Sequence, residues 1–391
     1  MKAITRTVWI LSLVSLFTDT ASEMLYPVMP LYLKSIGFSI VLIGILEGIA
    51  EAVAGLSKGY FGKLSDSTGR RMPFVQWGYA LSAVSKPLMA VFATPIWIFF
   101  VRTIDRVGKG VRTGARDAVL SGEASISNKA AIFGFHRSMD TLGAVIGPLL
   151  ALLYLQWFPG NYKTLFTIAL APGILAVIGT LLLRDKKLIV QTNNLPVNFF
   201  SFLHYWEKSP VTYRRLVGGL LAFTLFNSSD VFLLLKVKDA GINDTNIITI
   251  YIFYNLVYAI AAFPMGMLAD WLGVKKIFIF GLLLFAVVYV GMAYANQSFH
   301  FYTLFFLYGI YAAATEGISK AWITNISGKE DTATAIGTYS AFQSICTMLA
   351  STIAGLLWFQ FGAFFTFLTS SIAVVIIALY FLFNRFENAN N

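Results

Sequence analysis

Long apolar stretches follow one another along almost the whole 391-residue chain, separated by short polar connections. A helix of about 20 apolar residues is long enough to cross the hydrocarbon core of a bilayer. The pattern predicts twelve such helices, at residues 8–33, 40–61, 73–93, 95–120, 130–157, 164–183, 214–236, 246–267, 277–295, 300–324, 333–359 and 363–384.

The first stretch resembles a signal peptide only at its start. Its apolar run continues past Asp19 and Glu23 as far as Leu33, and no small-residue cleavage site follows a short apolar core. We therefore interpret it as the first membrane span.

Composition supports the same fold class. Hydrophobic residues make up 57% of the chain and charged residues 12%, and the mean hydropathy is +0.72. Soluble domains carry about twice that share of charged residues, so a soluble protein is excluded. Cys346 is the only cysteine and the histidines number 3, so we predict no internal disulfide, no metal site of Cys and His ligands, and no cofactor.

The longest connection divides the predicted helices into two sets of six. We predict an all-α integral membrane protein with an N-terminal half at 1–184, a cytoplasmic linker at 185–213 and a C-terminal half at 214–391. Within the linker, a short interfacial helix and a plain connection are equally open. The apolar residues that would form one face of that helix are Phe199, Phe200, Phe202, Leu203 and Trp206.

Basic residues are distributed unequally between the two sides of the predicted membrane. With the N-terminus inside, most Lys and Arg of the short connections fall on the inner side, as expected for cytoplasmic loops. The inner residues are Lys2, Arg6, Lys63, Arg70, Arg71, Lys129, Arg184, Lys186, Lys187, Lys208, Arg214, Arg215, Lys275, Lys276, Lys329 and Arg385; the outer ones are Lys34, Lys163, Lys236 and Lys238. We expect both termini in the cytoplasm of a bacterium, with the chain in the inner membrane. Topology then explains the net charge of +10 without a nucleic-acid partner.

A sequence repeat relates the two halves. The segment from Gly62 to Arg71 follows the second span, and a similar segment begins at Gly266, after the eighth. The same offset of 204 residues takes Asp66 to Asp270. Two halves with the same orientation in the membrane are therefore expected to be related by a parallel repeat.

Three motifs resemble those of the major facilitator superfamily of secondary transporters. The loop Gly-Lys-Leu-Ser-Asp-Ser-Thr-Gly-Arg-Arg at 62–71 is similar to its signature cytoplasmic loop, and 266–276 to the second copy. Residues 106–110 resemble the fourth-helix motif, with Lys109 where glutamine is more common, and 143–148 resemble the fifth-helix motif of antiporters. The resemblance implies a central cavity that opens alternately to each side, and a latch. The latch residues would be Gly62, Asp66, Gly69, Arg70, Arg71 and Asp270.

Ionisable residues inside the predicted spans are the main functional signal. A charge at the bilayer centre costs at least about 2.5 to 3.5 kcal/mol, so such residues persist where they face a partner or a polar path. Acids and bases are equally numerous there, which favours ion pairing. We expect purely structural pairs near the cytoplasmic ends, at Lys58, Arg112, Arg116 and Asp117.

Helical spacing identifies candidates for proton coupling. Asp19 and Glu23 are four residues apart, as are Glu47 and Glu51, so each pair presents two carboxylates on one helix face. Two carboxylates that close do not both ionise readily, so one of them is suited to holding a proton. On the fifth helix His136 and Asp140 share a face, and His136 could equally be a packing residue.

A cationic stripe suggests the chemistry of the solute. Arg102, Arg106 and Lys109 recur on one face of the fourth helix with Asp105 beside them. Such a stripe stabilises carboxylate or phosphate groups through charge-assisted hydrogen bonds. The other candidate solute-binding residues are Arg137, Asp230, Glu316 and Lys320.

These features favour a proton-coupled secondary transporter for a small polar, anionic organic solute. A drug or lipophile efflux antiporter is the alternative, supported by the fifth-helix motif and opposed by the many bases. A non-transporting receptor or lipid-handling protein of the same fold is the third reading. The chain shows no nucleophile, base and acid set and no phosphate-binding loop, so an enzyme is not expected. The expected partners are the solute, protons and the lipid bilayer; the oligomeric state is left open.

Overall fold

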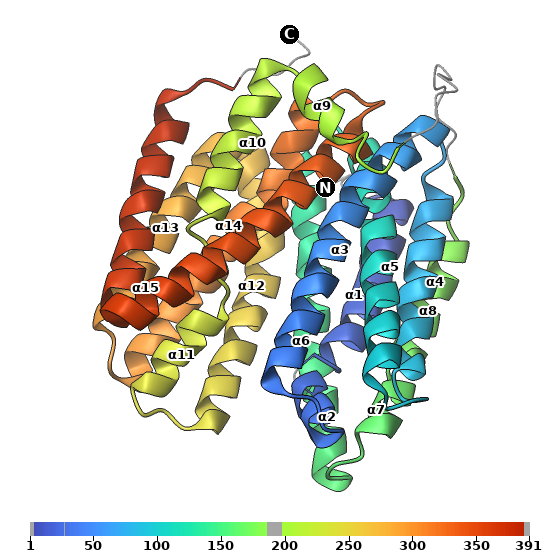
Figure 1. The fold of residues 1–391 in the computed structure, drawn as a ribbon. Helices are drawn as coiled ribbons and strands as arrows, with labels where there is room; N and C mark the ends of the chain where they lie inside the picture. The colour runs from blue at the N-terminus through green and yellow to red at the C-terminus, as the bar shows by residue number, and fades with distance from the viewer. Residues whose placement is uncertain (1–3, 27, 186–197, 387–391) are drawn as a thin grey trace. The chain divides into compact units, whose positions relative to one another are not determined.

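The computed structural model describes residues 4–26, 28–185 and 198–386, and within these residues it consists of α-helices and their connections, without β-strands. Contacts divide the chain into two compact units (Figure 1). Unit 1 comprises Met1–Glu123, Met139–Lys208 and Gly328–Ser344, and unit 2 comprises Ala124–Ser138, Ser209–Ser327 and Ile345–Asn391. Each unit therefore includes one short segment from the opposite half of the sequence: Gly328–Ser344 in unit 1 and Ala124–Ser138 in unit 2.

Unit 1 is a helical bundle in which α3, α4 and α5 pack side by side (Figure 1). Its helices are α1 (Arg6–Glu23), α2 (Met29–Ser35), α3 (Ile40–Thr68), α4 (Met72–Leu88), α5 (Pro95–Glu123), α7 (Tyr162–Ile168), α8 (Leu170–Leu181) and α9 (Leu203–Lys208), with most of α6 (Lys129–Trp157). The start of α15 (Thr332–Phe383) completes it.

Unit 2 is built around α12, α13 and α14, which also pack against one another. Its helices are α10 (Val211–Thr224), α11 (Val231–Asp239), α12 (Asp244–Leu272), α13 (Val274–Tyr294) and α14 (Ser298–Ile326), with the first turns of α6 and most of α15. Phe278, Phe285 and Phe301 are fully buried in this unit.

Several predicted spans are interrupted. The span predicted at 8–33 is divided into α1 and α2, the one at 164–183 into α7 and α8, and the one at 214–236 into α10 and α11. The last two predicted spans, 333–359 and 363–384, form α15, which changes direction at Gly362 with φ 82°. A positive φ costs glycine little because glycine has no Cβ.

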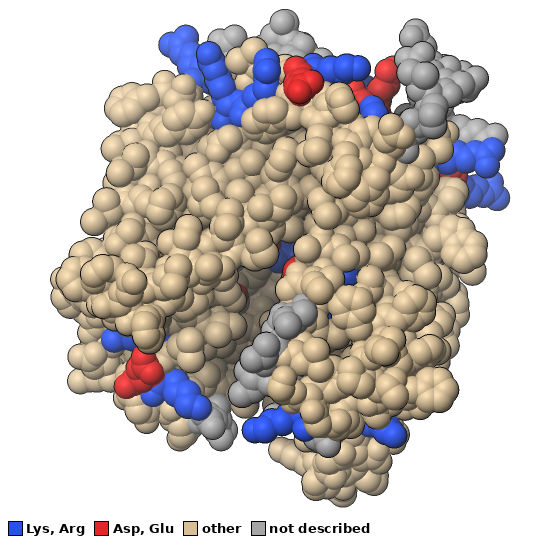
Figure 2. Space-filling view, viewed as in Figure 1, with Lys and Arg blue, Asp and Glu red and all other residues tan. Residues whose placement is uncertain are grey.

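On the face drawn in Figure 2, the middle of the surface carries few charged side chains, and Lys and Arg gather towards its upper and lower edges. Among the described residues, five helical segments are long and apolar enough to cross a membrane by length and composition: Lys129–Trp157, Tyr162–Leu181, Asn246–Leu272, Val274–Tyr294 and Thr332–Phe383. Helix α5 is not one of these five segments, because it contains the charged residues Arg102, Asp105, Arg106 and Lys109.

The predicted linker contains a short helix. α9 occupies Leu203–Lys208, and the ring of Phe202 packs directly over Gly59 of α3, where an added Cβ would lie 2.7 Å from it. Residues 186–197 of the linker lie outside the described residues, as does Lys2. The predicted boundaries of the two halves and the predicted membrane orientation stay predictions.

Glycines of the fifth-helix motif allow close packing of α6 on α1. A Cβ on Gly143 would lie 2.6 Å from the Leu16 carbonyl oxygen, and one on Gly147 would lie 2.6 Å from the Met24 nitrogen. No side chain fits there without moving backbone. This motif therefore has a packing role in unit 1.

We predict that Gly143→Leu destabilises the protein. The added side chain must separate α6 from α1, and such overpacking costs about 1 to 3 kcal/mol. Thermal unfolding of the detergent-purified protein should show a clearly lowered Tm. Gly218→Leu is the matched control, since a Cβ at Gly218 meets nothing within 4 Å. Equal Tm values for the two variants would contradict the packing role.

Candidate functional site

A polar cavity lies in unit 1, and the space between its walls, together with the solvent at its mouth, amounts to about 540 Å³. We call it the basic cavity. Helices α1, α4 and α5 supply its walls. Its charged lining residues are Asp19, Glu23, Lys86, Arg102, Asp105, Arg106, Lys109 and Arg112.

Asp105 is the central acid of this cavity. Its Oδ1 atom lies 3.6 Å from the Lys86 Nζ atom, and its Oδ2 atom lies 3.6 Å from the Arg102 Nη1 atom. The Ser85 hydroxyl also donates a hydrogen bond of 3.2 Å to Asp105. Lys86 is almost fully buried, so the carboxylate that it shares with Arg102 offsets part of the cost of burying two bases.

Two further bases of the cavity are held by neighbouring helices. The Arg112 guanidinium donates a hydrogen bond of 2.7 Å to the Ser82 hydroxyl and lies 4.5 Å from the centre of the Tyr79 ring. The Arg106 Nη1 atom lies 3.0 Å from the Glu51 Oε1 atom on α3. Side chains of α4 and α3, the helices that pack against α5, therefore hold Arg112 and Arg106 in place.

Lys109 differs from the other bases. It lines the cavity and its side chain is exposed, and the described part of the chain offers it no carboxylate within ion-pair distance. An ammonium group with three donors is thus available to an anion that enters the cavity.

A second buried network connects α5, α1 and α6 within unit 1. Arg116 pairs with Asp117 at 2.9 Å and donates a hydrogen bond of 3.4 Å to the Ser15 hydroxyl. The Ser15 hydroxyl in turn donates to the Asp140 carboxylate, and the Asp140 and Asp19 carboxyl groups lie close enough to repel one another when both are charged. Two carboxyl groups that close do not both ionise readily.

Unit 2 contains its own charged group. Arg137 pairs with Glu316, and its Nε atom donates a hydrogen bond of 2.6 Å to the Tyr258 hydroxyl, with the guanidinium 5.3 Å from the ring centre. Lys320 follows Glu316 by one helical turn on α14. Asp230 lies at the start of α11 and accepts a hydrogen bond of 2.7 Å from the Tyr308 hydroxyl.

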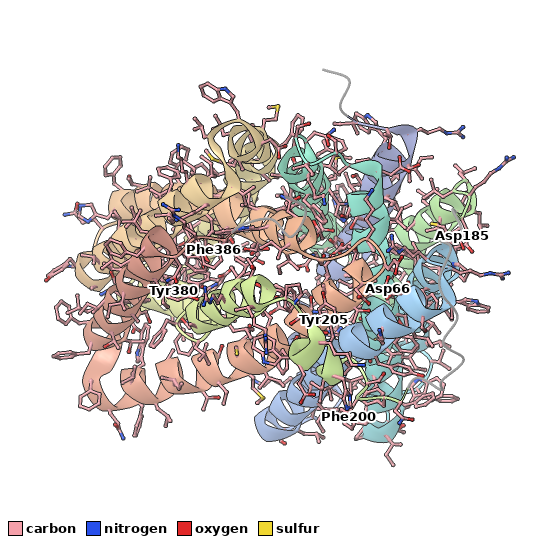
Figure 3. The ribbon with its side chains drawn as sticks, turned by 90° about the horizontal axis from the view of Figure 1, so that it is seen from above. Asp66, Asp185, Phe200, Tyr205, Tyr380 and Phe386 are labelled. Carbon is pink, nitrogen blue, oxygen red and sulfur yellow. The ribbon has the colours of Figure 1, made fainter. Side chains whose placement is uncertain are left out.

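The first copy of the repeat places Asp66 at the end of α3 in unit 1 (Figure 3). Its carboxylate accepts hydrogen bonds from the Thr334 backbone N–H at 2.7 Å and the Thr334 hydroxyl at 2.8 Å, in the first turn of α15. Arg71 donates to Asp66 at 3.3 Å and to the Lys329 carbonyl at 3.0 Å. A negative charge there also interacts favourably with the dipole of α15.

Glycines bring these helix ends together. Gly69 ends α3 with φ 64°, which allows the sharp turn into α4. A Cβ on Gly62 would lie 2.5 Å from the Ala333 carbonyl oxygen. Arg70 is exposed, so of the two arginines it is Arg71 that takes part in this contact.

The second copy of the repeat makes the same kind of contact in unit 2. The Asp270 carboxylate accepts hydrogen bonds of 2.9 and 2.8 Å from the backbone N–H groups of Ala130 and Ala131, in the first turn of α6. A Cβ on Gly266 would lie 2.4 Å from the Ala130 carbonyl oxygen. Each acid therefore caps the N-terminus of a helix that is distant in sequence.

Asp66 lies beyond the predicted span 40–61, and its ionisation responds to its surroundings. Burial raises the pKa of the Asp66 carboxyl to about 6, although Arg71 and the Thr334 donors favour its charged form. The contact with α15 thus involves a group that titrates near neutral pH.

Not every predicted site residue joins these networks. The side chain of Glu47 lies outside the described part of the chain. Glu23 lines the basic cavity, and His136 is buried in the segment of α6 that belongs to unit 2. Helical spacing pairs Asp19 with Glu23, whereas the contact found for Asp19 is with Asp140.

Several residues of these networks were not predicted from the sequence, because they are neutral or are common in helix cores. Ser15, Ser82, Thr334 and Tyr308 each form a hydrogen bond with a charged group, and the ring of Tyr79 contacts the Arg112 guanidinium. Their only sequence signal is a polar residue inside an apolar span. Within the described residues, no group of three or more His, Cys, Asp or Glu side chains is arranged to hold a metal ion.

Comparisons with known proteins agree with this architecture. The family model described as Major Facilitator Superfamily matches residues 11–237 and 215–390. An uncharacterized MFS-type transporter of Methanocaldococcus jannaschii is 30% identical over 388 residues, covering 98% of this chain and 96% of that protein. A multi-drug resistance efflux pump PmrA homolog of Lactococcus lactis is 23% identical, covering 85% and 82%. The crystal structure of the human organic anion transporter MFSD10 (TETRAN) has a similar fold, with a TM-score of 0.81, 15% identity, and coverage of 96% and 99%.

We predict that Asp105→Asn strongly destabilises the protein. The change leaves Lys86 and Arg102 without their carboxylate, and breaking a buried ion pair costs about 3 to 5 kcal/mol. The measurement is the free energy of unfolding in a denaturant titration of the detergent-purified protein.

Asp331→Asn provides the control. It breaks the pair of Asp331 with Lys63 at 3.6 Å, in which both side chains are substantially exposed, and exposed pairs contribute at most about 1 kcal/mol. A small loss for both variants would show that Asp105 is not the neutralising centre of the cavity.

Proposed function

The chain belongs to the Major Facilitator Superfamily and is a multi-pass membrane protein, and from this premise we propose that it is a proton-coupled secondary transporter of a small anionic organic solute. The observation that carries the proposal is the charge of the basic cavity. Its lining contains five bases, Lys86, Arg102, Arg106, Lys109 and Arg112, and three acids, Asp19, Glu23 and Asp105. An anion would balance the excess of positive charge.

Lys109 and its neighbours on α5 would bind the solute. Lys109 offers an ammonium group that forms no ion pair with a carboxylate among the described residues, while Arg102 and Arg106 offer guanidinium groups that match the geometry of carboxylates. The existing pair of Arg106 with Glu51 would compete with the solute. In unit 2, Arg137, Glu316 and Lys320 are the residues we assign to solute contact.

The carboxyl pair of Asp19 and Asp140 would carry the coupling proton. Two carboxyl groups this close favour a state in which one of them holds a proton, and Ser15 and Arg116 connect the pair to α5, the helix of the cationic stripe. Loss of that proton would leave two negative charges close together and would strengthen the attraction for Lys109 and Arg112. Glu23, Glu47, Glu51 and His136 remain in the proposed coupling set.

Transport would proceed by alternating access, with the contacts of Asp66 and Asp270 acting as latches at the cytoplasmic side. Gly62, Gly69 and Arg71 belong to the first latch, whereas Arg70, proposed from the sequence, is exposed and takes no part in its contacts. Both termini would lie in the cytoplasm, with the protein in a bacterial inner membrane. The chemistry is binding and release of a solute and of protons, which makes the protein a transporter and not an enzyme.

An efflux antiporter for lipophilic compounds is the second candidate. A relative named as a multi-drug resistance efflux pump homolog supports it, together with the row of tyrosines in unit 2 formed by Tyr254, Tyr258, Tyr308 and Tyr311. Aromatic rings offer the flat apolar surface that such compounds need, although these tyrosines are almost fully buried and would have to move apart to admit them.

Anion binding is tested by thermal unfolding of the detergent-purified protein with organic acids, phosphorylated metabolites, sugars and lipophilic cations. We expect stabilisation by multiply charged organic anions, because a ligand at about 100 times its Kd adds about 2.7 kcal/mol. Lys109→Gln should lose that stabilisation, while Lys163→Gln, which changes an exposed lysine outside the cavity, should retain it. Stabilisation by lipophilic cations alone would favour the efflux antiporter.

Proton coupling is tested in proteoliposomes with an imposed pH gradient. Asp19→Asn and Asp140→Asn should abolish uphill transport but retain solute counterflow, since exchange of solute does not require net proton movement. Asp239→Asn, at the exposed end of α11, is the matched control. Undiminished uphill transport by both Asp19→Asn and Asp140→Asn would remove the pair from the coupling mechanism.

A further inference from the structure

The break between α10 and α11 leaves a carboxylate without a charged partner. Asp230 is half-buried, the Tyr308 hydroxyl donates a hydrogen bond to it, the Tyr254 hydroxyl lies within hydrogen-bonding reach, and the described residues give it no ion pair. The nearest candidate, Arg137, is paired with Glu316. Although Asp230 occupies the N-cap of α11, its side chain makes no capping hydrogen bond to that helix. A carboxylate in such a place needs a positive charge.

The same break has more oxygen acceptors than donors. The Asn227 side-chain nitrogen donates a hydrogen bond of 3.0 Å to the Tyr311 hydroxyl, whereas its Oδ1 atom is buried and accepts none. In the described part of the chain, no backbone N–H donates to the carbonyls of Asn227 or Ser228. Inside a bilayer, such carbonyls need another partner because water is absent.

Three elements of unit 2 meet at this point. The break itself contributes residues 225–230, α14 contributes Tyr308 and Tyr311, whose ring centres are 5.1 Å apart, and α15 contributes Ser351. The Ser351 hydroxyl accepts a hydrogen bond of 3.4 Å from the Ser229 N–H. Asn227 and Asp230 are therefore held on neighbouring tyrosines of one helix.

The surroundings limit the size and charge of the missing partner. Tyr254, Tyr308 and Tyr311 are 5%, 2% and 3% exposed, so the tyrosines are closely packed and leave little room for an organic ammonium ion. A proton would satisfy one oxygen atom and leave the Asn227 side-chain oxygen and the open carbonyls unchanged. Several neutral oxygens with a single carboxylate match a hard monovalent cation.

We propose that the break between α10 and α11 is a binding site for Na⁺, with Asp230 as the charged ligand and the Asn227 side-chain oxygen and the carbonyls of the break as neutral ligands. Unwound backbone between two half-helices is a means by which transporters coordinate small cations. The site lies within unit 2, and its occupancy does not depend on the chemistry proposed for the basic cavity. It gives Asp230 a role other than solute contact.

The test is thermal unfolding of the full-length detergent-purified protein in increasing NaCl, with choline chloride added to keep ionic strength constant. We expect a saturable rise in Tm with Na⁺ and a smaller effect of KCl at the same concentrations. Asp230→Asn should weaken the apparent Na⁺ affinity by at least about tenfold, equivalent to about 1.4 kcal/mol. Asp239→Asn, on the exposed end of the same helix, should behave as the unchanged protein.

Two results would overturn the site. The first is that Na⁺ does not change the Tm of the unchanged protein. If acidification alone raises that Tm, the partner of Asp230 is a proton. The second is the same Na⁺ response in Asp230→Asn as in the unchanged protein.

A variant that fails to fold would not leave the question open. Binding of radioactive Na⁺ by the unchanged protein is measured directly, and Asn227→Ala, which keeps the carboxylate, should reduce that binding. Because the readout is Na⁺ binding and not transport, a failure of the proposed anion transport would leave it unaffected.

Discussion

Charge neutralisation inside an apolar bundle is the constraint on which unit 1 depends. Asp105 must reach Lys86 on α4 and Arg102 on its own helix at once, which is possible only when α4 and α5 are very close. Glycines permit that approach, since a Cβ on Gly78 would lie 2.7 Å from the Gly108 carbonyl oxygen. Packing and electrostatics are therefore one requirement here: a bulkier residue at the helix contact would also separate the ions.

At the helix ends, the two copies of the sequence repeat form the same kind of contact. Asp66 and Asp270 were recognisable as equivalent from their spacing, but their partners, Thr334 on α15 and Ala130 on α6, have no distinctive sequence signal. Both partners are backbone N–H groups of a first helical turn, which any residue can supply. Each repeated acid can thus bind a helix start of any sequence, because its partners are the free N–H groups of a helix N-terminus.

Family and fold class followed from the sequence, since twelve apolar stretches and the loop at 62–71 are direct consequences of a bilayer environment and of a tight helix connection; both are confirmed. The interruptions were not foreseen, because hydropathy measures transfer to lipid and is blind to a local loss of helical hydrogen bonds at residues 225–230. Spacing along one helix paired Asp19 with Glu23, while the structure joins it to Asp140 of another helix. The roles of these residues in transport stay predictions, since a contact does not reveal when in a cycle it is used.

The divided helix between residues 211 and 239 has a consequence for biosynthesis. Its two parts contain 14 and 9 residues, so neither is long enough to cross a bilayer alone, and the polar break between them would be costly in lipid. The hydrogen-bonding groups that accommodate the break come from α14 and α15, which the ribosome makes later. During membrane insertion this segment therefore reaches its final position only after α14 and α15 have been made. Until then it is held by the translocation machinery or at the membrane surface.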